Sequence, residues 1–355
     1  MAENTSRRSF LSMGTLAGAV SLAAGSRAEA EPQKPRRKLR VGAFGAIAYS
    51  FWGIWADLLS PAGRAGTSIL NMELSHVWDK DFAEAEKFAA KWGCEAVKKY
   101  DDMLGKVDGV VCGGLYEVPW QHLMFRPYLK AGMPCYLSRP WAYRIKDMEE
   151  MLELAAKYSA PLIATATYEH YNEADSLRDK LPGVGQIKSV AATCTGGDFP
   201  HFHIQHMMPK ILGYNVQQVS LITNDVKKPQ YLQDTFLMGG DDKQPPYLCT
   251  MHSAPGPYVF HITIIGTEGT EVASMPGSSN YFYRFATQLM DIQKTIEGKN
   301  YQDFDIVRKK HINWITAHYS HVERKGAPVA TGTVPSDWSP PHWMPGWMDD
   351  SMFKN

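Results

Sequence analysis

The stretch Leu39-Arg40-Val41-Gly42-Ala43-Phe44-Gly45 decides the fold of this chain. It is a short apolar run that ends in a glycine, which is typical of a first buried strand and the turn after it. A second strand is predicted over 70–78, and residues 81–93 repeat apolar side chains with the period of a helix packed on a sheet. A strand, a helix and another strand in this order predict a parallel sheet.

The alternation of strands and helices continues through the first half of the chain. Strands are predicted over 107–112, 134–137 and 162–166, and helices over 120–131 and 145–158. Repeated units of this kind predict an α/β fold that starts with a Rossmann-like, doubly wound parallel sheet. Its ligand crevice is expected at the carboxyl ends of the strands.

Beyond Tyr171 the pattern changes to that of an α+β domain. Strands are predicted over 185–193, 216–222, 247–252, 258–267 and 271–274, and helices over 173–180, 206–212, 282–297 and 305–325. Within 258–267, Phe260, Ile262 and Ile264 alternate with Val259, His261 and Thr263, as in a strand with one buried face. We expect a large, mostly antiparallel sheet with helices against it, and its exposed face favours a dimer or tetramer of identical chains.

Composition is that of a globular protein with two cores. The chain has 355 residues, of which 44% are hydrophobic and 21% are charged, so it has enough apolar surface to fold. Its 37 basic and 37 acidic residues balance, which argues against nucleic acid as a partner. The five cysteines contain no CxxC pair. We expect Cys112 and Cys135 to be buried as small hydrophobes, with one disulfide left open as an alternative.

The first 30 residues have the layout of a twin-arginine signal peptide. The pair Arg7-Arg8 is followed by a weakly apolar stretch over 13–24 and by Ala28-Glu29-Ala30, a set of small residues for signal peptidase. About 12 apolar residues are too few to cross the hydrocarbon core, so no stable membrane span is expected. We expect export as a folded protein by the twin-arginine (Tat) machinery, to the periplasm or otherwise out of the cytoplasm.

These patterns divide the chain into five segments. They are a signal peptide at 1–30, a linker at 31–38, a Rossmann-like domain at 39–167, an α+β substrate domain at 168–333 and a Pro- and Trp-rich tail at 334–355.

Five local strings, in order, resemble the Gfo/Idh/MocA family of sugar and cyclitol oxidoreductases. They are 41–45 (VGAFG), 77–81 (VWDKD), 107–111 (VDGVV), 129–134 (LKAGMP) followed by Ser138-Arg139-Pro140, and 185–190 (GQIKSV). The resemblance covers nearly the whole mature chain. It implies a carbohydrate substrate and a tightly bound NAD or NADP, held by Gly42, Gly45, Asp79 and Arg139.

Two departures from the family pattern bear on the chemistry. If Gly45 is the first glycine of the dinucleotide fingerprint, Ile47 and Ser50 occupy the second and third glycine positions, where backbone should approach the pyrophosphate. This departure leaves open an enzyme without the cofactor. Arg139 replaces the lysine of the family's EKP motif, and a guanidinium holds an anion but is a poor proton carrier.

The second domain supplies His203 at the position of the family's active-site histidine, ten residues before Gly213. His206 lies one helical turn later, so that His203, His206 and Asp198 could in principle bind a metal. We favour a catalytic His203, with His206 lining a polar crevice as a candidate substrate-binding residue, and expect no metal.

The segment Tyr168-Glu169-His170-Tyr171 follows the last strand of the first domain, where the resemblance places the sugar site. Tyr168 is a candidate proton shuttle. His170, Tyr171 and Trp141 are candidate substrate-binding residues, with packing between the domains as the alternative. His311, His318 and His321 are expected on a solvated or interface face.

Three functions remain open at this point. The first is a hydride-transferring oxidoreductase acting on a sugar or glycoside. The second is a cofactor-independent lyase or hydrolase, in which Arg139 binds a uronate carboxylate while Tyr168 and His203 act as acid and base. The third is a noncatalytic sugar-binding protein.

Overall fold

The computed structural model describes residues 37–46, 50–59, 70–113, 120–195, 200–223, 231–257, 259–276, 281–299 and 302–341. Residues 37–355 form one compact unit. The predicted signal peptide and most of the tail lie outside the described residues. None of the described helices is both long and apolar enough to cross a membrane.

The first sheet has the strand order of a Rossmann fold. Its strands are β1 (Leu39–Phe44), β2 (Met72–Trp78), β3 (Glu95–Val97), β4 (Gly109–Cys112), β5 (Cys135–Leu137) and β6 (Leu162–Ala164). They pair in the order β3-β2-β1-β4-β5-β6, and every pair is parallel. The predicted doubly wound sheet is therefore confirmed, and β3 is a short edge strand that the sequence pattern did not indicate.

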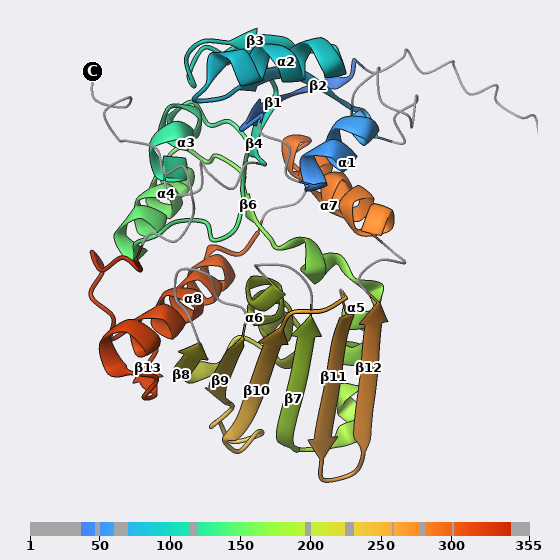
Figure 1. The fold of residues 1–355 in the computed structure, drawn as a ribbon, viewed down its shortest axis with the longest axis vertical. Helices are drawn as coiled ribbons and strands as arrows, with labels where there is room; N and C mark the ends of the chain where they lie inside the picture. Colours follow the sequence, from blue (N-terminus) through green and yellow to red (C-terminus); the bar gives the residue numbers. More distant parts are fainter. Residues whose placement is uncertain are drawn as a thin grey trace, which may run out of the picture. The chain divides into compact units, whose positions relative to one another are not determined.

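Helices lie against this sheet as the apolar periodicity predicts (Figure 1). They are α1 (Ser50–Leu59), α2 (Phe82–Trp92), α3 (Gln121–Lys130) and α4 (Ile145–Lys157). The helix α2 begins where the Asp81 side chain accepts a hydrogen bond from the Ala83 amide, and it ends at Gly93 with φ of 72°. The residue that caps α2 is therefore Asp81, and Asp79 is not needed as the helix cap.

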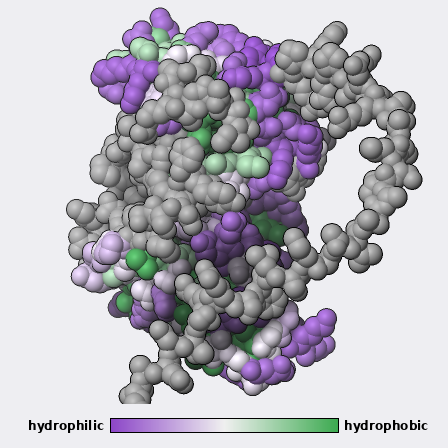
Figure 2. Space-filling model, turned by 90° about the vertical axis from the view of Figure 1, so that its right-hand side faces the viewer, coloured by the Kyte–Doolittle hydropathy of each residue, from purple (hydrophilic) through white to green (hydrophobic). Residues whose placement is uncertain are grey.

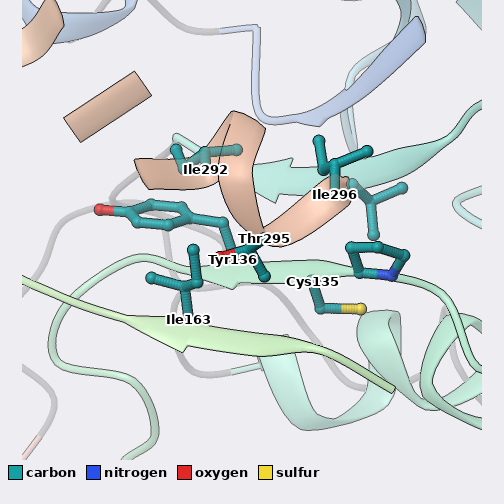
Figure 3. A pocket seen from close by; sticks show the side chains of 8 residues that line it. Cys135, Tyr136, Ile163, Ile292, Thr295 and Ile296 are labelled. Carbon is teal, nitrogen blue, oxygen red and sulfur yellow. The ribbon is translucent and has the colours of Figure 1, made fainter. Parts of the chain in front are cut away.

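A helix from late in the chain, α7 (Tyr281–Ile296), completes the cover of the first sheet. Phe285, Leu289 and Ile292 belong to the same apolar core as Val41 and Trp55. The hollow left between α7 and strands β4 to β6 is small and apolar, with a volume of about 10 Å³ (Figure 3). That is room for at most one water molecule, so this hollow is a packing defect and no ligand site.

The second sheet has seven strands in the order β12-β11-β7-β10-β9-β8-β13. Its strands are β7 (Ile187–Thr195), β8 (Val216–Thr223), β9 (Leu232–Met238), β10 (Tyr247–Ala254), β11 (Val259–Gly266), β12 (Thr270–Pro276) and β13 (Val329–Ala330). Only β7 and β10 pair in parallel. The large, mostly antiparallel sheet is confirmed, although the sequence pattern missed β9 and β13.

One face of this sheet packs against helices, and the other is open. The helices are α5 (Asn172–Lys180), α6 (Pro200–Leu212) and α8 (Phe304–Arg324). Two 3-10 turns, η2 (Thr167–His170) and η3 (Leu181–Val184), precede the sheet. In β11 the buried residues are Phe260, Ile262 and Ile264, as predicted.

The open face carries exposed apolar side chains, among them Ile222, Leu248, Ile265 and Val272. On the side of the molecule seen in Figure 2, the described surface is mainly hydrophilic and its hydrophobic residues form small groups. The dimer or tetramer expected through the open face of the sheet stays a prediction.

The cysteines behave as small hydrophobes. Cys112 and Cys135 are buried, as predicted, and none of the five cysteines, all of which the structure describes, forms a disulfide.

Candidate active site

The turn after β1 is bound to the acidic tip of β2. Gly45 has φ of 86°, a conformation that favours glycine, and its amide donates to the Trp78 carbonyl at 2.8 Å. The Asp79 carboxylate accepts from the amide of Ala46 through Oδ2 at 2.7 Å and from the amide of Asp81 through Oδ1 at 2.9 Å. Asp79 is only 2% exposed. The first glycine of the predicted fingerprint and the predicted ribose-binding acid are therefore neighbours.

The structure does not test the other positions expected to contact the pyrophosphate or the cofactor. Ile47 and the Ser50 side chain lie outside the described residues. Gly42 lies inside β1, where an added Cβ would stand 2.7 Å from the sulfur of Met103 and 3.3 Å from side-chain carbons of Val107 and Val110. This close packing is reason enough for a glycine there, and the cofactor role assigned to Gly42 stays a prediction.

Gln121 holds the loop after β5 that carries Arg139. The Gln121 side chain accepts from the Ser138 amide at 2.7 Å and donates to the carbonyls of Ser138 and Trp141 at 2.7 and 3.2 Å. Arg139 is 5% exposed, and its Nη2 lies 3.5 Å from Nε2 of His203. A guanidinium only donates hydrogen bonds, so in this contact Nε2 of His203 is the acceptor and its proton belongs on Nδ1.

His203 lies on α6, and Tyr168 lies on η2 next to it. Their ring centroids are 4.1 Å apart with an interplanar angle of 43°, and the other side of Tyr168 packs on Phe260 at 4.4 Å. Both residues are almost fully buried. Arg139, Tyr168 and His203 come from three separate segments, and the structure brings them together.

The helix carrying His203 is longer than the sequence pattern predicts. It begins at Pro200, whereas we expected it to begin at His206. The helical period could not be recognised because the buried side chains of the first turns include His203 and His206 as well as the apolar Phe202 and Ile204. A proline at the first position of a helix is a start signal that could have extended the prediction.

His206 contacts a different neighbour from His203. Its ring meets that of Trp141 edge to face, with centroids 4.7 Å apart. Asp198, the third ligand of the alternative metal site, lies outside the described residues. Within the part of the chain that the structure describes, no three side chains of His, Cys, Asp or Glu are placed to hold a metal ion.

His170 and Tyr171 are buried beside the same turn. Tyr171 packs on Tyr168 with centroids 5.2 Å apart. His170 places Nδ1 3.3 Å from Asp291 of α7 and Nε2 3.1 Å from the Thr165 hydroxyl. Burial works against the ionisation of Asp291, but the hydrogen bonds and charges of His170 and Lys294 together outweigh it, so the pKa of Asp291 is lowered. His170 thus ties η2 to α7, and its substrate contact stays a prediction.

Residues 39–166 match the model of the Gfo/Idh/MocA family, described as an oxidoreductase family with an NAD-binding Rossmann fold. The match covers the first domain and agrees with its parallel sheet of Rossmann strand order. Comparison with curated proteins finds no match.

Several solved structures of similar fold are described as dehydrogenases, and each covers more than four fifths of this chain. Scyllo-inositol dehydrogenase from Lactobacillus casei, solved with NAD(H) and scyllo-inositol, has a TM-score of 0.69 at 13% identity, covering 83% of this chain and 100% of that one. The WlbA dehydrogenase from Chromobacterium violaceum, solved with NADH and UDP-GlcNAcA, has a TM-score of 0.66 at 18% identity, covering 86% and 98%. A probable dehydrogenase from Thermotoga maritima has a TM-score of 0.67 at 15% identity, covering 84% and 100%. At these identities the likeness shows the shared fold.

The first domain fits a dinucleotide at the β1 and β2 tips. Gly45 leaves the turn without a side chain, and the Asp79 carboxylate beside it is an acceptor of the kind that a ribose hydroxyl needs. This agreement concerns the adenosine end of the cofactor, because residues 47–49 of the turn are outside the described residues.

A buried ion pair that we did not predict lies under this site. Lys310 of α8 places Nζ 2.8 and 3.1 Å from the two carboxylate oxygens of Glu169, and its side chain has no exposed surface. Burial lowers the pKa of Lys310, and Glu169 offsets part of that effect. A signal was present in the sequence, because Lys310 falls on the helical row of Val307 and Trp314, which is the buried face of α8.

The expectation that His311, His318 and His321 lie on a solvated or interface face of α8 is wrong for the first two. His311 and His318 are buried beside Trp314, with ring centroids 6.1 and 4.7 Å from it, and only His321 keeps partial exposure. Burial lowers the pKa of His311 to about 4, so its ring is neutral at ordinary pH. The apolar surroundings from α6 and from the loop after β5 could not be read from the pattern of α8 alone.

Proposed function

We propose that this protein is an NAD-dependent oxidoreductase that oxidises a hydroxyl group of a sugar, a sugar derivative or a cyclitol. The observation that carries the proposal is the Asp79 carboxylate bound to the turn after Gly45, in a sheet of Rossmann strand order. The cluster of Arg139, Tyr168 and His203 supports it as the place of hydroxyl chemistry. The substrates of the inositol and sugar dehydrogenases of similar fold support the substrate class.

The Asp79 carboxylate favours NAD over NADP. A carboxylate accepts hydrogen bonds from ribose hydroxyls and repels a phosphate in the same position. Bound NAD⁺ would accept the hydride that leaves the substrate carbon. All other steps belong to side chains of the chain itself.

His203 is the group that takes the hydroxyl proton. Nε2 carries the one lone pair of the neutral ring and faces Arg139, so the substrate hydroxyl would replace the guanidinium at this atom and transfer its proton to Nε2. Arg139 keeps its positive charge and stabilises the negative charge that develops on the substrate oxygen. Tyr168, whose ring packs against that of His203 at a tilt, orients the imidazole and offers its phenol to the same oxygen.

The proposal predicts that the purified mature protein binds NAD⁺ through Asp79. Asp79→Asn should weaken NAD⁺ binding by about tenfold or more, since a charge-assisted acceptor is replaced by a neutral amide. Calorimetric titration of both proteins measures the change. Asp81→Asn is the matched control, because Asp81 is an acid of the same loop that caps α2.

Wild-type protein must also contain or bind a nicotinamide cofactor. Mass spectrometry of the denatured protein detects one that was retained through purification. A folded wild-type protein that releases no nicotinamide and does not bind added NAD⁺ would overturn the proposal.

A second candidate function uses the same three side chains without a redox cofactor. In a uronate lyase, Arg139 would bind the carboxylate while His203 and Tyr168 exchange protons with the ring. The observation that favours it is the buried guanidinium of Arg139 at His203, where the resemblance leads us to expect a lysine. Incubation with uronic-acid oligosaccharides without NAD⁺ separates the two functions, because only a lyase then forms an unsaturated product.

Both candidates predict the same outcome for Arg139→Lys. An ammonium offers one compact charge in place of the paired donors of a guanidinium, so substrate affinity should fall by about tenfold. Steady-state kinetics measure the change in KM. A gain in NAD-linked turnover in this variant would show instead that the site needs a proton carrier at this position.

We propose that the protein is exported through the twin-arginine route. The proposal is supported by the order of three features at the start of the sequence: the pair Arg7-Arg8, then a weakly apolar stretch, and then Ala28-Glu29-Ala30. Replacing both arginines with lysine should leave a folded precursor in the cytoplasm, which cell fractionation and immunoblotting detect. Normal maturation of this variant by the same route would contradict the proposal.

A further inference from the structure

We propose that Lys310 is a positioning residue for the active site, joining through one ammonium group the three segments that carry Arg139, Tyr168 and His206. The segments are the loop after β5, the η2 turn and, through a ring contact, α6. This inference rests on the proposed active site, and it assigns a task to the one buried lysine of α8.

Lys310 holds the η2 turn from below. Its Nζ donates to both carboxylate oxygens of Glu169 and to the Ala164 carbonyl at the end of β6, at 3.1 Å. Glu169 in turn accepts from the Ala166 amide at 2.8 Å. The turn that presents Tyr168 is thus fixed at its start by Ala166 and in its middle by Glu169.

The same ammonium group supports the loop after β5. Nζ lies 4.9 Å from the centroid of the Trp141 ring, within the range of a cation–π contact. Trp141 meets His206 of α6 edge to face. Lys210 of α6 adds a hydrogen bond to the Glu169 carbonyl, so α6 is tied to the same turn.

These contacts exclude a direct catalytic task for Lys310. An ammonium has three hydrogens, and three acceptor atoms surround Nζ, which has no exposed surface. Lys310 therefore does not replace the lysine that Arg139 displaced. It acts on the reaction through the position of Tyr168 and, through Trp141, of the loop that carries Arg139, and displacements of about 1 Å in such groups lower turnover by roughly 10²-fold.

The test compares Lys310→Met with Lys309→Met in the full mature protein. Lys309 is the adjacent lysine on the exposed face of α8, so this control removes the same charge one residue away. Hydrogen exchange followed by mass spectrometry needs neither substrate nor cofactor. We expect faster exchange over 164–171 in Lys310→Met, unchanged exchange over β7, and no change in the control.

A second arm separates positioning from mere stability. The variant Lys310→Met/Glu169→Gln contains no unpaired buried charge and keeps an acceptor for the Ala166 amide, so it should recover most of the thermal stability lost by Lys310→Met. Its kcat should stay about 10²-fold low, with the KM for NAD⁺ within twofold, because Asp79 and Gly45 are untouched.

Each result decides the inference. Unchanged exchange over 164–171 in Lys310→Met overturns it, whether or not the protein uses NAD⁺. A stable double variant with normal kcat overturns it as well, because the pair would then serve stability alone. A wild-type protein without NAD-linked activity would instead count against the proposed function and leave the exchange experiment to decide the positioning role.

Discussion

Replacing His203 with alanine is expected to lower turnover by roughly 10²-fold or more, which is the common range for a lost general acid or base. The imidazole is the one group of the cluster that can both accept and donate a proton near neutral pH. Its Nε2 faces Arg139 and its ring packs against Tyr168, so the loss removes the proton acceptor and leaves the charge of Arg139 in place. Steady-state kinetics on the NAD-linked reaction measure the change.

Two other histidines serve as controls for this prediction. His206→Ala should have a mild effect, because His206 packs on Trp141 rather than on the reacting cluster. His321→Ala, at the end of α8 with partial exposure, should have none. Circular dichroism and the thermal midpoint must match wild type in all three variants. Near-normal turnover of well-folded His203→Ala would mean that the active site lies elsewhere.

The sequence predicted the elements of the fold because its signals are local. The apolar run at 39–44 became β1 with the predicted bounds, and the alternation of Phe260, Ile262 and Ile264 became the buried face of β11. Helix periods and turn glycines are set by neighbours in the chain, so they can be read from it. The family resemblance led us to name Arg139, Tyr168 and His203 as candidate site residues before the structure placed them together.

Contacts between distant segments could not be predicted in this way. Lys310 and Glu169 are 141 positions apart, and the sequence around either residue does not indicate that the two form an ion pair. The apolar face of α7 was visible in the pattern, yet the pattern does not say that this face packs on the first sheet rather than on the second. In β9, polar Gln233 and Thr235 flank a buried Asp234, and a charged residue on the inner face hides the strand signal.

Asp234 leads to a stability prediction. It is 1% exposed on the inner face of β9, and burial raises its pKa to about 8, although the polar side chain of Gln205 offsets part of the effect. The unfolded chain releases this proton near pH 4. Between these two values the native state holds one more proton than the unfolded state, so the free energy of unfolding falls as pH rises and levels off above pH 8.

Asp234→Asn should remove this loss of stability at high pH, because the amide keeps the shape of the protonated carboxyl and never ionises. One pH unit corresponds to about 1.4 kcal/mol, so relative to wild type the variant should gain on the order of 4 kcal/mol between pH 5 and pH 8. Urea unfolding of both proteins at several pH values measures the difference. Asp242→Asn, at an exposed position in the turn before β10, is the control and should follow wild type throughout. If wild type and Asp234→Asn keep a constant stability difference from pH 5 to pH 8, then Asp234 is ionised in the native protein and the inner face of β9 accommodates a charge.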